Sequence, residues 1–113
     1  MTNRMTHDFK LDGDKVRELM IITMEECGEL TQACSKVIRT MMSEGEIRED
    51  VLSKLKQEAA DVICMVELMK ENGLVNDEEI QNGIEIKRDK LRKWSDLIPK
   101  RPTWQEILAD EDE

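Results

Sequence analysis

Pairs of acidic residues spaced three apart are the part of this sequence best suited to chemistry. On a helix such a pair shares one face, so two carboxylates can bind one cation or divide acid and base roles. Random placement of this many acids would give about six such pairs, so spacing alone carries little information. The pairs present are Glu26/Glu29, Glu46/Glu49, Glu58/Asp61 and Asp110/Glu113.

Sequence context separates two of these pairs from the others. Glu26 and Glu29 stand in Met-Glu-Glu-Cys-Gly-Glu-Leu, within an apolar helical period. Glu58 and Asp61 stand in Glu-Ala-Ala-Asp-Val-Ile-Cys-Met-Val, the most apolar stretch of the chain. At about 100° per residue, Glu58 lies well inside the apolar arc of its helix and Asp61 lies on its flank. Glu26 and Glu29 flank the apolar face of the other helix, while Glu25 points further outward. Two packed helices can therefore aim four carboxylates at one another.

Such a cluster needs compensating charge, because carboxylates repel one another and are costly to desolvate. Oxygen-only ligands on a rigid scaffold suit Mg²⁺, with Mn²⁺ as an alternative. The sequence thus predicts a metal site formed by Glu26, Glu29, Glu58 and Asp61. On the residues alone, another interpretation remains open, in which each acid pairs with a Lys or Arg across a helix interface.

The elements that carry these acids are helices. Apolar residues recur at helical spacing from Asp14 to Met42, and again from residue 49 or 50 to Glu71. Asn76 and Glu79 form a capping-box pattern before a third helix that extends to Trp94, and Thr103 begins another before a short last helix. The sequence therefore predicts an all-α fold with three main helices and a short C-terminal one. We expect one domain over residues 1–113, with a core of 14–94 and an extension of 95–113 that ends in an acidic tail.

Composition excludes several classes of function. The chain has 113 residues with 17 Lys+Arg and 26 Asp+Glu, a formal net charge of −9, so it lacks the basic stripe that free DNA or RNA requires. No apolar run approaches the roughly 18 residues of a membrane span, and no signal peptide is recognisable at the N-terminus. We therefore expect a cytoplasmic protein without a nucleic-acid or membrane partner. The three cysteines are Cys27, Cys34 and Cys64, and we expect their thiols to be buried and reduced. Together with the single His7 they form no credible zinc set.

Helix length predicts self-association. A helix from Asp14 to Met42 is about 43 Å long. A compact monomer of this size has a diameter of only about 35 Å, so this helix overhangs its own domain. Three helices also make an incomplete bundle. We expect a second copy to complete it, as a homodimer or a homotetramer.

The double acidic motif resembles that of the MazG-like, all-α nucleoside triphosphate pyrophosphohydrolases. The likeness rests on Glu26-x-x-Glu29 and Glu58-x-x-Asp61, with Glu-Cys-Gly-Glu-Leu around the first pair and Gln-Glu-Ala-Ala-Asp-Val-Ile around the second, and covers roughly Val16 to Trp94. The resemblance implies an oligomeric helical bundle whose four acids bind Mg²⁺. It also implies hydrolysis of a (deoxy)nucleoside triphosphate to the monophosphate and pyrophosphate.

The likeness weakens on the third helix, where many relatives carry a lysine followed by an asparagine and a basic residue. This chain lacks the asparagine but keeps its cationic character, so we expect Lys87, Arg88 and Lys90 to contact the phosphates. In the expected mechanism, a metal-activated water attacks the α-phosphorus and a carboxylate accepts its proton. Glu26 or Glu25 is the predicted acceptor.

Other functions remain open. The chain could be a non-catalytic helical module for homodimerisation, with its acids in surface ion pairs. It could also be a specialised relative that acts on phosphoribosyl-ATP or on dUTP. A ferritin-like di-iron bundle is set aside, because that site needs Glu-x-x-His motifs and His7 lies outside the predicted helices.

Overall fold

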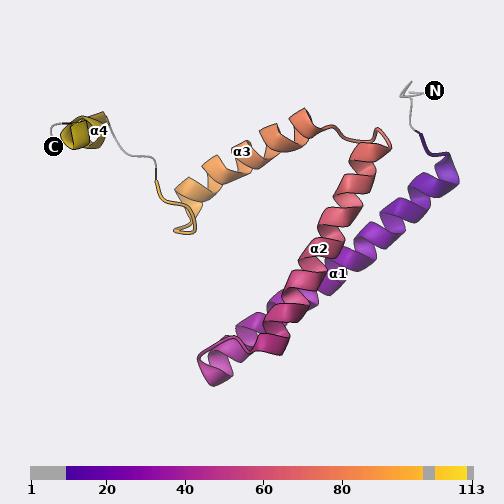
Figure 1. The fold of residues 1–113 in the computed structure, drawn as a ribbon, viewed down its shortest axis with the longest axis horizontal. Helices are drawn as coiled ribbons and strands as arrows, with labels where there is room; N and C mark the ends of the chain where they lie inside the picture. The colour runs from indigo at the N-terminus through magenta and orange to yellow at the C-terminus, as the bar shows by residue number, and fades with distance from the viewer. Residues whose placement is uncertain (1–9, 101–103, 112–113) are drawn as a thin grey trace. The chain divides into compact units, whose positions relative to one another are not determined.

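The computed structural model describes residues 10–100 and 104–111, and within them every regular element is a helix (Figure 1). These helices are α1 (Gly13–Glu44), α2 (Glu49–Glu71), α3 (Asp77–Trp94) and α4 (Trp104–Glu111). The predicted all-α fold of three long helices and a short C-terminal one is therefore confirmed. His7 and Thr103, which entered the sequence predictions, lie outside the described residues. No helix in the described part of the chain is both long enough and apolar enough to cross a bilayer.

The ends of α1 follow directly from its terminal residues. The Asp12 side chain accepts a hydrogen bond from the Lys15 amide at 2.9 Å, which caps an otherwise unpaired donor. At the other end Gly45 takes a φ of 75° and donates to the Met41 carbonyl. Only glycine adopts this left-handed conformation without steric cost, so it ends the helix and turns the chain toward α2.

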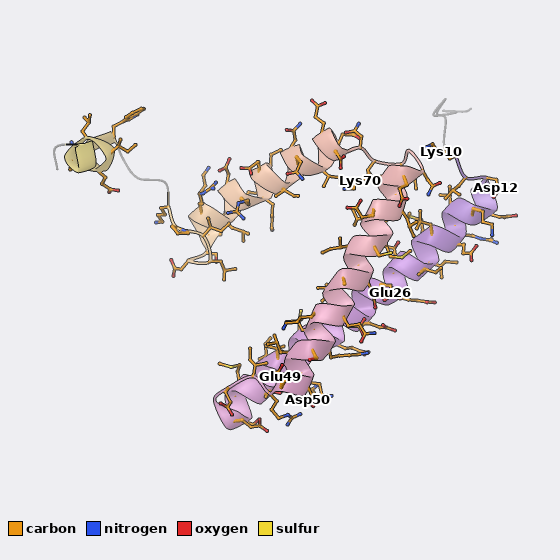
Figure 2. All side chains as sticks on the ribbon, viewed as in Figure 1. Lys10, Asp12, Glu26, Glu49, Asp50 and Lys70 are labelled. Atoms are coloured by element: carbon orange, nitrogen blue, oxygen red, sulfur yellow. The ribbon has the colours of Figure 1, made fainter. Side chains whose placement is uncertain are left out.

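The first turn of α2 begins close to the end of α1. Arg48 pairs with Glu44 at 3.0 Å and with Asp50 at 3.2 Å, which links the two helix ends across the turn. Glu49 and Asp50 place negative charge at the N-terminus of α2, where it is stabilised by the positive end of the helix dipole (Figure 2). The far ends of the hairpin are also joined, because the Lys10 amide donates to the Asn72 carbonyl at 3.2 Å.

Packing of α1 against α2 provides the frame for the acids. The apolar side chains buried in this pair are few: Leu19, Ala33, Val51 and Met65. Each helix packs against one neighbour, so it buries one stripe and leaves the rest of its apolar arc open to solvent. For this reason the prediction of buried thiols is wrong. The three free cysteines are all exposed: Cys27, Cys34 and Cys64.

The helix α3 forms largely from local signals. The Asn76 side chain accepts from the Glu79 amide, and the Glu79 side chain accepts from the Asn76 amide, so the predicted capping box is present. Acidic residues occupy the first turn and basic residues the last, as the helix dipole favours. No residue of α3 is fully buried. Trp94, the last residue of α3, is 85% exposed.

The chain divides into two compact units, Met1–Val75 and Asn76–Glu113. The first contains α1 and α2 with all four candidate metal ligands. The second contains α3 and α4. The four clustered acids and the cavity beside them lie within the first unit.

Candidate metal centre

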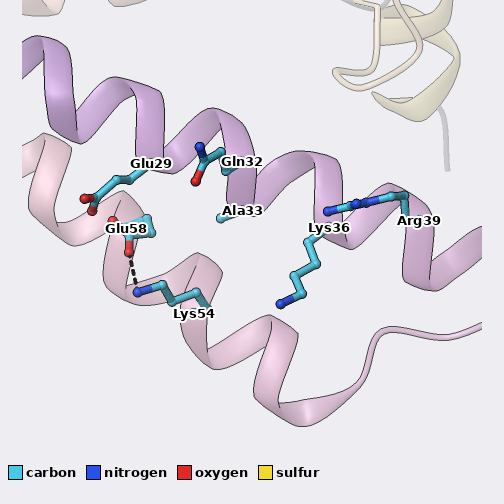
Figure 3. A pocket seen from close by; sticks show the side chains of 7 residues that line it. All are labelled: Glu29, Gln32, Ala33, Lys36, Arg39, Lys54 and Glu58. Atoms are coloured by element: carbon cyan, nitrogen blue, oxygen red, sulfur yellow. Dashed lines mark ion pairs between the residues drawn. The ribbon is translucent and has the colours of Figure 1, made fainter.

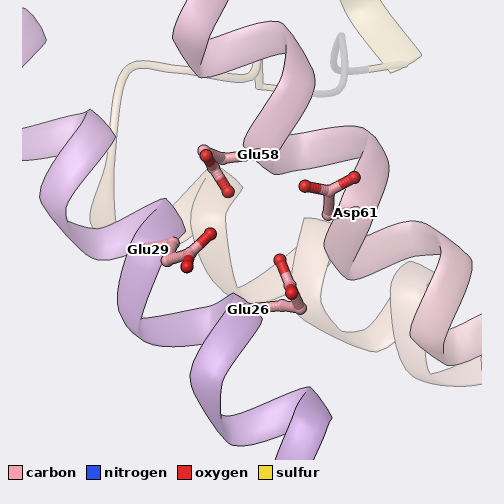
Figure 4. A group of neighbouring side chains, drawn as sticks. All are labelled: Glu26, Glu29, Glu58 and Asp61. Atoms are coloured by element: carbon pink, nitrogen blue, oxygen red, sulfur yellow. The ribbon is translucent and has the colours of Figure 1, made fainter.

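Four carboxylates from α1 and α2 meet at one point of the helical hairpin. Glu26 and Glu29 project from α1, and Glu58 and Asp61 from α2, toward a common centre (Figure 4). One carboxylate oxygen from each residue lies within 4.8 Å of the others. The sequence predicted this convergence from helical positions alone, and the structure contains it. A cluster of this kind could hold a metal ion.

Burial differs sharply across the cluster. Glu58 is 1% exposed and is the largest fully buried side chain among the described residues. Glu26 and Asp61 are half-buried, and Glu29 is exposed. The predicted place of Glu58 inside the apolar arc of α2 is thus confirmed. The opening lies on the Glu29 side, so a ligand can reach the buried end of the cluster from there.

Charge is poorly balanced within the cluster. The one cation bound to it among the described residues is Lys54, whose Nζ lies 2.8 Å from Glu58 Oε1. Oε2 of Glu58 and Oε2 of Glu26 are buried and accept no hydrogen bond. Buried polar atoms without a partner are uncommon in proteins and require an explanation. A divalent cation would supply the missing interaction for both oxygens, so the donor set fits such an ion.

The pKa shifts report the same imbalance. Desolvation raises the pKa of Glu26, and the nearby charges of Asp61 and Glu58 raise it further. The pKa of Glu29 is raised mainly because its carboxyl can hydrogen-bond Glu58 only while protonated. The hydrogen bond from Lys54 lowers the pKa of Glu58 and holds it ionised. The protonated form of both α1 carboxyls is therefore favoured more than it is for a free carboxyl group.

A cavity of about 410 Å³ opens beside the cluster along α1 (Figure 3). Its walls combine the acids Glu29 and Glu58 with Gln32 and Ala33 and with three cations: Lys36, Arg39 and Lys54. Sequence reasoning missed these cations as site residues. Lys36 stands two helical turns after Glu29, and Lys54 stands one turn before Glu58, but this spacing becomes informative only once the cavity between the two helices is known.

The other predicted site residues lie elsewhere. Glu25 is exposed on α1, outside the four-oxygen cluster, although its charge contributes to the raised pKa of Glu26. The predicted phosphate contacts, Lys87, Arg88 and Lys90, are exposed on α3, in the second unit. Their role in binding substrate stays a prediction.

Compared with protein-family models, with curated proteins and with solved structures, the chain matches none of them. The MazG-like resemblance therefore rests on the two acidic motifs and their apolar setting. At the level of structure, the chain is an all-α protein with four clustered acids that could hold a metal ion.

Proposed function

We propose that this chain is a Mg²⁺-dependent hydrolase that converts (deoxy)nucleoside triphosphates to the monophosphate and pyrophosphate, with Mn²⁺ as an alternative ion. One observation carries the proposal: four carboxylate oxygens from two facing helices lie within 4.8 Å of one another, and two buried carboxylate oxygens accept no hydrogen bond. A purely structural cluster of ion pairs would place a Lys or Arg against each acid. Among the described residues, one lysine, Lys54, forms an ion pair with this group of four carboxylates, and it does so through Glu58.

In the proposed site, Glu26, Glu29, Glu58 and Asp61 hold Mg²⁺. When bound, this ion supplies positive charge for the triphosphate and lowers the pKa of a coordinated water. The carboxylates fix its position because both helices are held by the packed hairpin. A triphosphate of charge near −4 cannot approach four carboxylates without such compensation.

The proton acceptor in this mechanism is Glu26 or Glu25. The water oxygen forms a bond to the α-phosphorus, the bond from that phosphorus to the bridging oxygen breaks, and pyrophosphate leaves with the electron pair. The proton of the water passes to the carboxylate. Glu25 lies outside the four-oxygen cluster, which leaves its carboxylate free for this role. Glu26 lies within the cluster and closer to the reacting atoms.

Self-association remains part of the proposal. Large apolar side chains stay exposed on both units of the single chain, among them Met24, Ile63 and Trp94, at 73%, 60% and 85%. A homodimer or homotetramer would cover such surface. The same exposure favours the second candidate function, a non-catalytic helical module, which would associate without releasing pyrophosphate.

The test is pyrophosphate release from the eight common nucleoside and deoxynucleoside triphosphates, with Mg²⁺ and with EDTA, and with phosphoribosyl-ATP and dUTP in the same panel. The proposal predicts release from at least one nucleoside triphosphate that stops in EDTA. Selective release from phosphoribosyl-ATP or dUTP would identify the specialised relative. No release from any substrate would reject the enzyme and favour the interaction module.

A further inference from the structure

The cavity beside the acid cluster is cationic in an otherwise acidic protein. The chain carries a net charge of −9, yet the wall that extends away from Glu29 presents Lys36 and Arg39 along α1. Lys36 extends from α1 toward α2 (Figure 3). No acid among the described residues forms an ion pair with Lys36 or with Arg39. Two like charges one turn apart on a helix repel each other, so an anion bound between them would relieve that repulsion.

The third cation, Lys54, links this cavity to the acid cluster. Its amine lies 2.8 Å from Glu58, but 58% of its side chain is exposed. Lys54 therefore lies at the boundary, where it can contact a carboxylate on one side and an anion in the cavity on the other. Since Lys54 interacts with Glu58, Glu29 and Asp61, a metal ion at the cluster would take over part of its role and release it toward the cavity.

The order of charges along α1 gives the site a direction. Lys36 is two turns from Glu29, about 10 Å along the helix, and Arg39 is almost one turn further. Acids, then cations, thus follow one another in a line on a single helix face. A polyphosphate chain has the matching pattern, because the phosphorus under attack must lie at the acids while the outer phosphates carry most of the remaining negative charge.

We propose that this cavity binds the two terminal phosphates of the substrate through Lys36, Arg39 and Lys54, so that the departing pyrophosphate lies along α1 and the nucleoside lies on the opposite side of the acid cluster. This inference rests on the proposed function and deepens it. It assigns the leaving-group site to the first helical unit.

The test compares two double variants with equal change in charge. One is Lys36→Met/Arg39→Met, and its control is Lys15→Met/Arg17→Met on the exposed N-terminal turns of the same helix. The first probe is inorganic tripolyphosphate with Mg²⁺, titrated by calorimetry. Hydrogen bonds to charged groups are the strong ones, so we expect the cavity variant to bind this probe about ten- to a hundredfold more weakly than the control. Circular dichroism checks that both variants keep the helical fold.

Steady-state kinetics on the best nucleoside triphosphate provides the second readout. The cavity variant should raise KM about tenfold or more, and pyrophosphate should inhibit it less than it inhibits the control. Equal tripolyphosphate affinity and equal KM in the two variants would overturn the inference while leaving an active wild-type enzyme in place. A wild-type protein that releases no pyrophosphate from any triphosphate would instead overturn the proposed function, whatever the calorimetry shows.

Discussion

The two units of the chain have similar helices but very different interiors. In the hairpin of α1 and α2, four apolar side chains, Thr40 and Glu58 are buried, whereas α3 buries no residue fully. Both carry amphipathic patterns, so the pattern specifies a helix in each. In the hairpin, α1 and α2 each cover part of the other's apolar stripe. The acid cluster lies there because carboxylates that repel one another stay close only on a packed frame.

Activity should show the largest difference between the buried cluster and the remaining acids. Glu58→Gln keeps the shape of the side chain but removes a negative charge from the centre of the cluster. We expect kcat/KM for pyrophosphate release to fall at least about a hundredfold, since the metal is held and oriented by its ligands. The measurement is steady-state release with saturating Mg²⁺.

The matched control is Glu46→Gln. Glu46 lies between α1 and α2 and belongs with Glu49 to an acidic pair in polar surroundings. Its activity should stay within about twofold of wild type. Equal activity in the two variants would contradict the assignment of Glu58 to the metal site.

Truncating an apolar side chain should likewise destabilise the hairpin more than it destabilises the second unit. Leu19 is 6% exposed in the hairpin, so Leu19→Ala should lower the free energy of unfolding by about 2–4 kcal/mol. Ile86 is 57% exposed on α3, so Ile86→Ala should cost less than about 0.5 kcal/mol in a monomer. Chemical denaturation measures both. If Ile86→Ala instead lowers the free energy of unfolding strongly, and by an amount that depends on protein concentration, a second chain covers α3.

The pH dependence of stability tests the charge imbalance of the hairpin. The pKa values of Glu26 and Glu29 are raised above 4.5 in the folded chain, so above that pH the folded chain binds more protons than the unfolded one. Their contribution therefore makes the metal-free protein less stable as the pH rises from 4.5 through the raised values. Glu58 acts with the opposite sign and only below 4.5, because its pKa is lowered.

Denaturation in EDTA across this pH range, for wild type and for Glu26→Gln, isolates the effect. The loss of stability with rising pH should be smaller in the variant, and saturating Mg²⁺ should reduce it in wild type. Parallel profiles in EDTA would mean that Glu26 titrates normally in the folded chain.

The last expected effect is confined to α3, whose N-terminus depends on its capping box. Asn76→Ala removes the acceptor of the Glu79 amide and should lower helix stability by about 1 kcal/mol. Far-ultraviolet circular dichroism should show this as a modest loss of helix during early melting. The hairpin transition should not move, which would distinguish a local cap from a residue that supports both units.

Local signals made most of the fold predictable. Asp12, Gly45 and the Asn76/Glu79 box end or begin helices through contacts within a few residues, so the sequence contains all the information they need. Helical position likewise predicted that Glu58 would be buried and would face the acids of α1. The sequence did not predict exposed cysteines or an exposed Trp94, because periodicity indicates which face is apolar but not how much of it a neighbour covers.

The cations of the cavity show a different limit. Lys36 and Arg39 look like ordinary residues of a solvated helix face, and nothing in their local sequence marks them. Their assignment to a binding site depends on the cavity between α1 and α2, which exists only once the two helices pack. Lys54 was likewise hidden, since its pairing with Glu58 becomes informative only when the other three acids are known to lie beside it.

Divalent cation binding by the metal-free protein tests the central claim most directly. Titration with Mn²⁺, followed by electron paramagnetic resonance, measures how much of the ion is removed from solution, and Mg²⁺ should displace it. We expect saturable binding in wild type and in Glu46→Gln, and binding at least about tenfold weaker in Glu58→Gln. Equal Mn²⁺ binding in all three proteins, or no saturable binding in wild type, would contradict the claim that these four carboxylates form a metal centre.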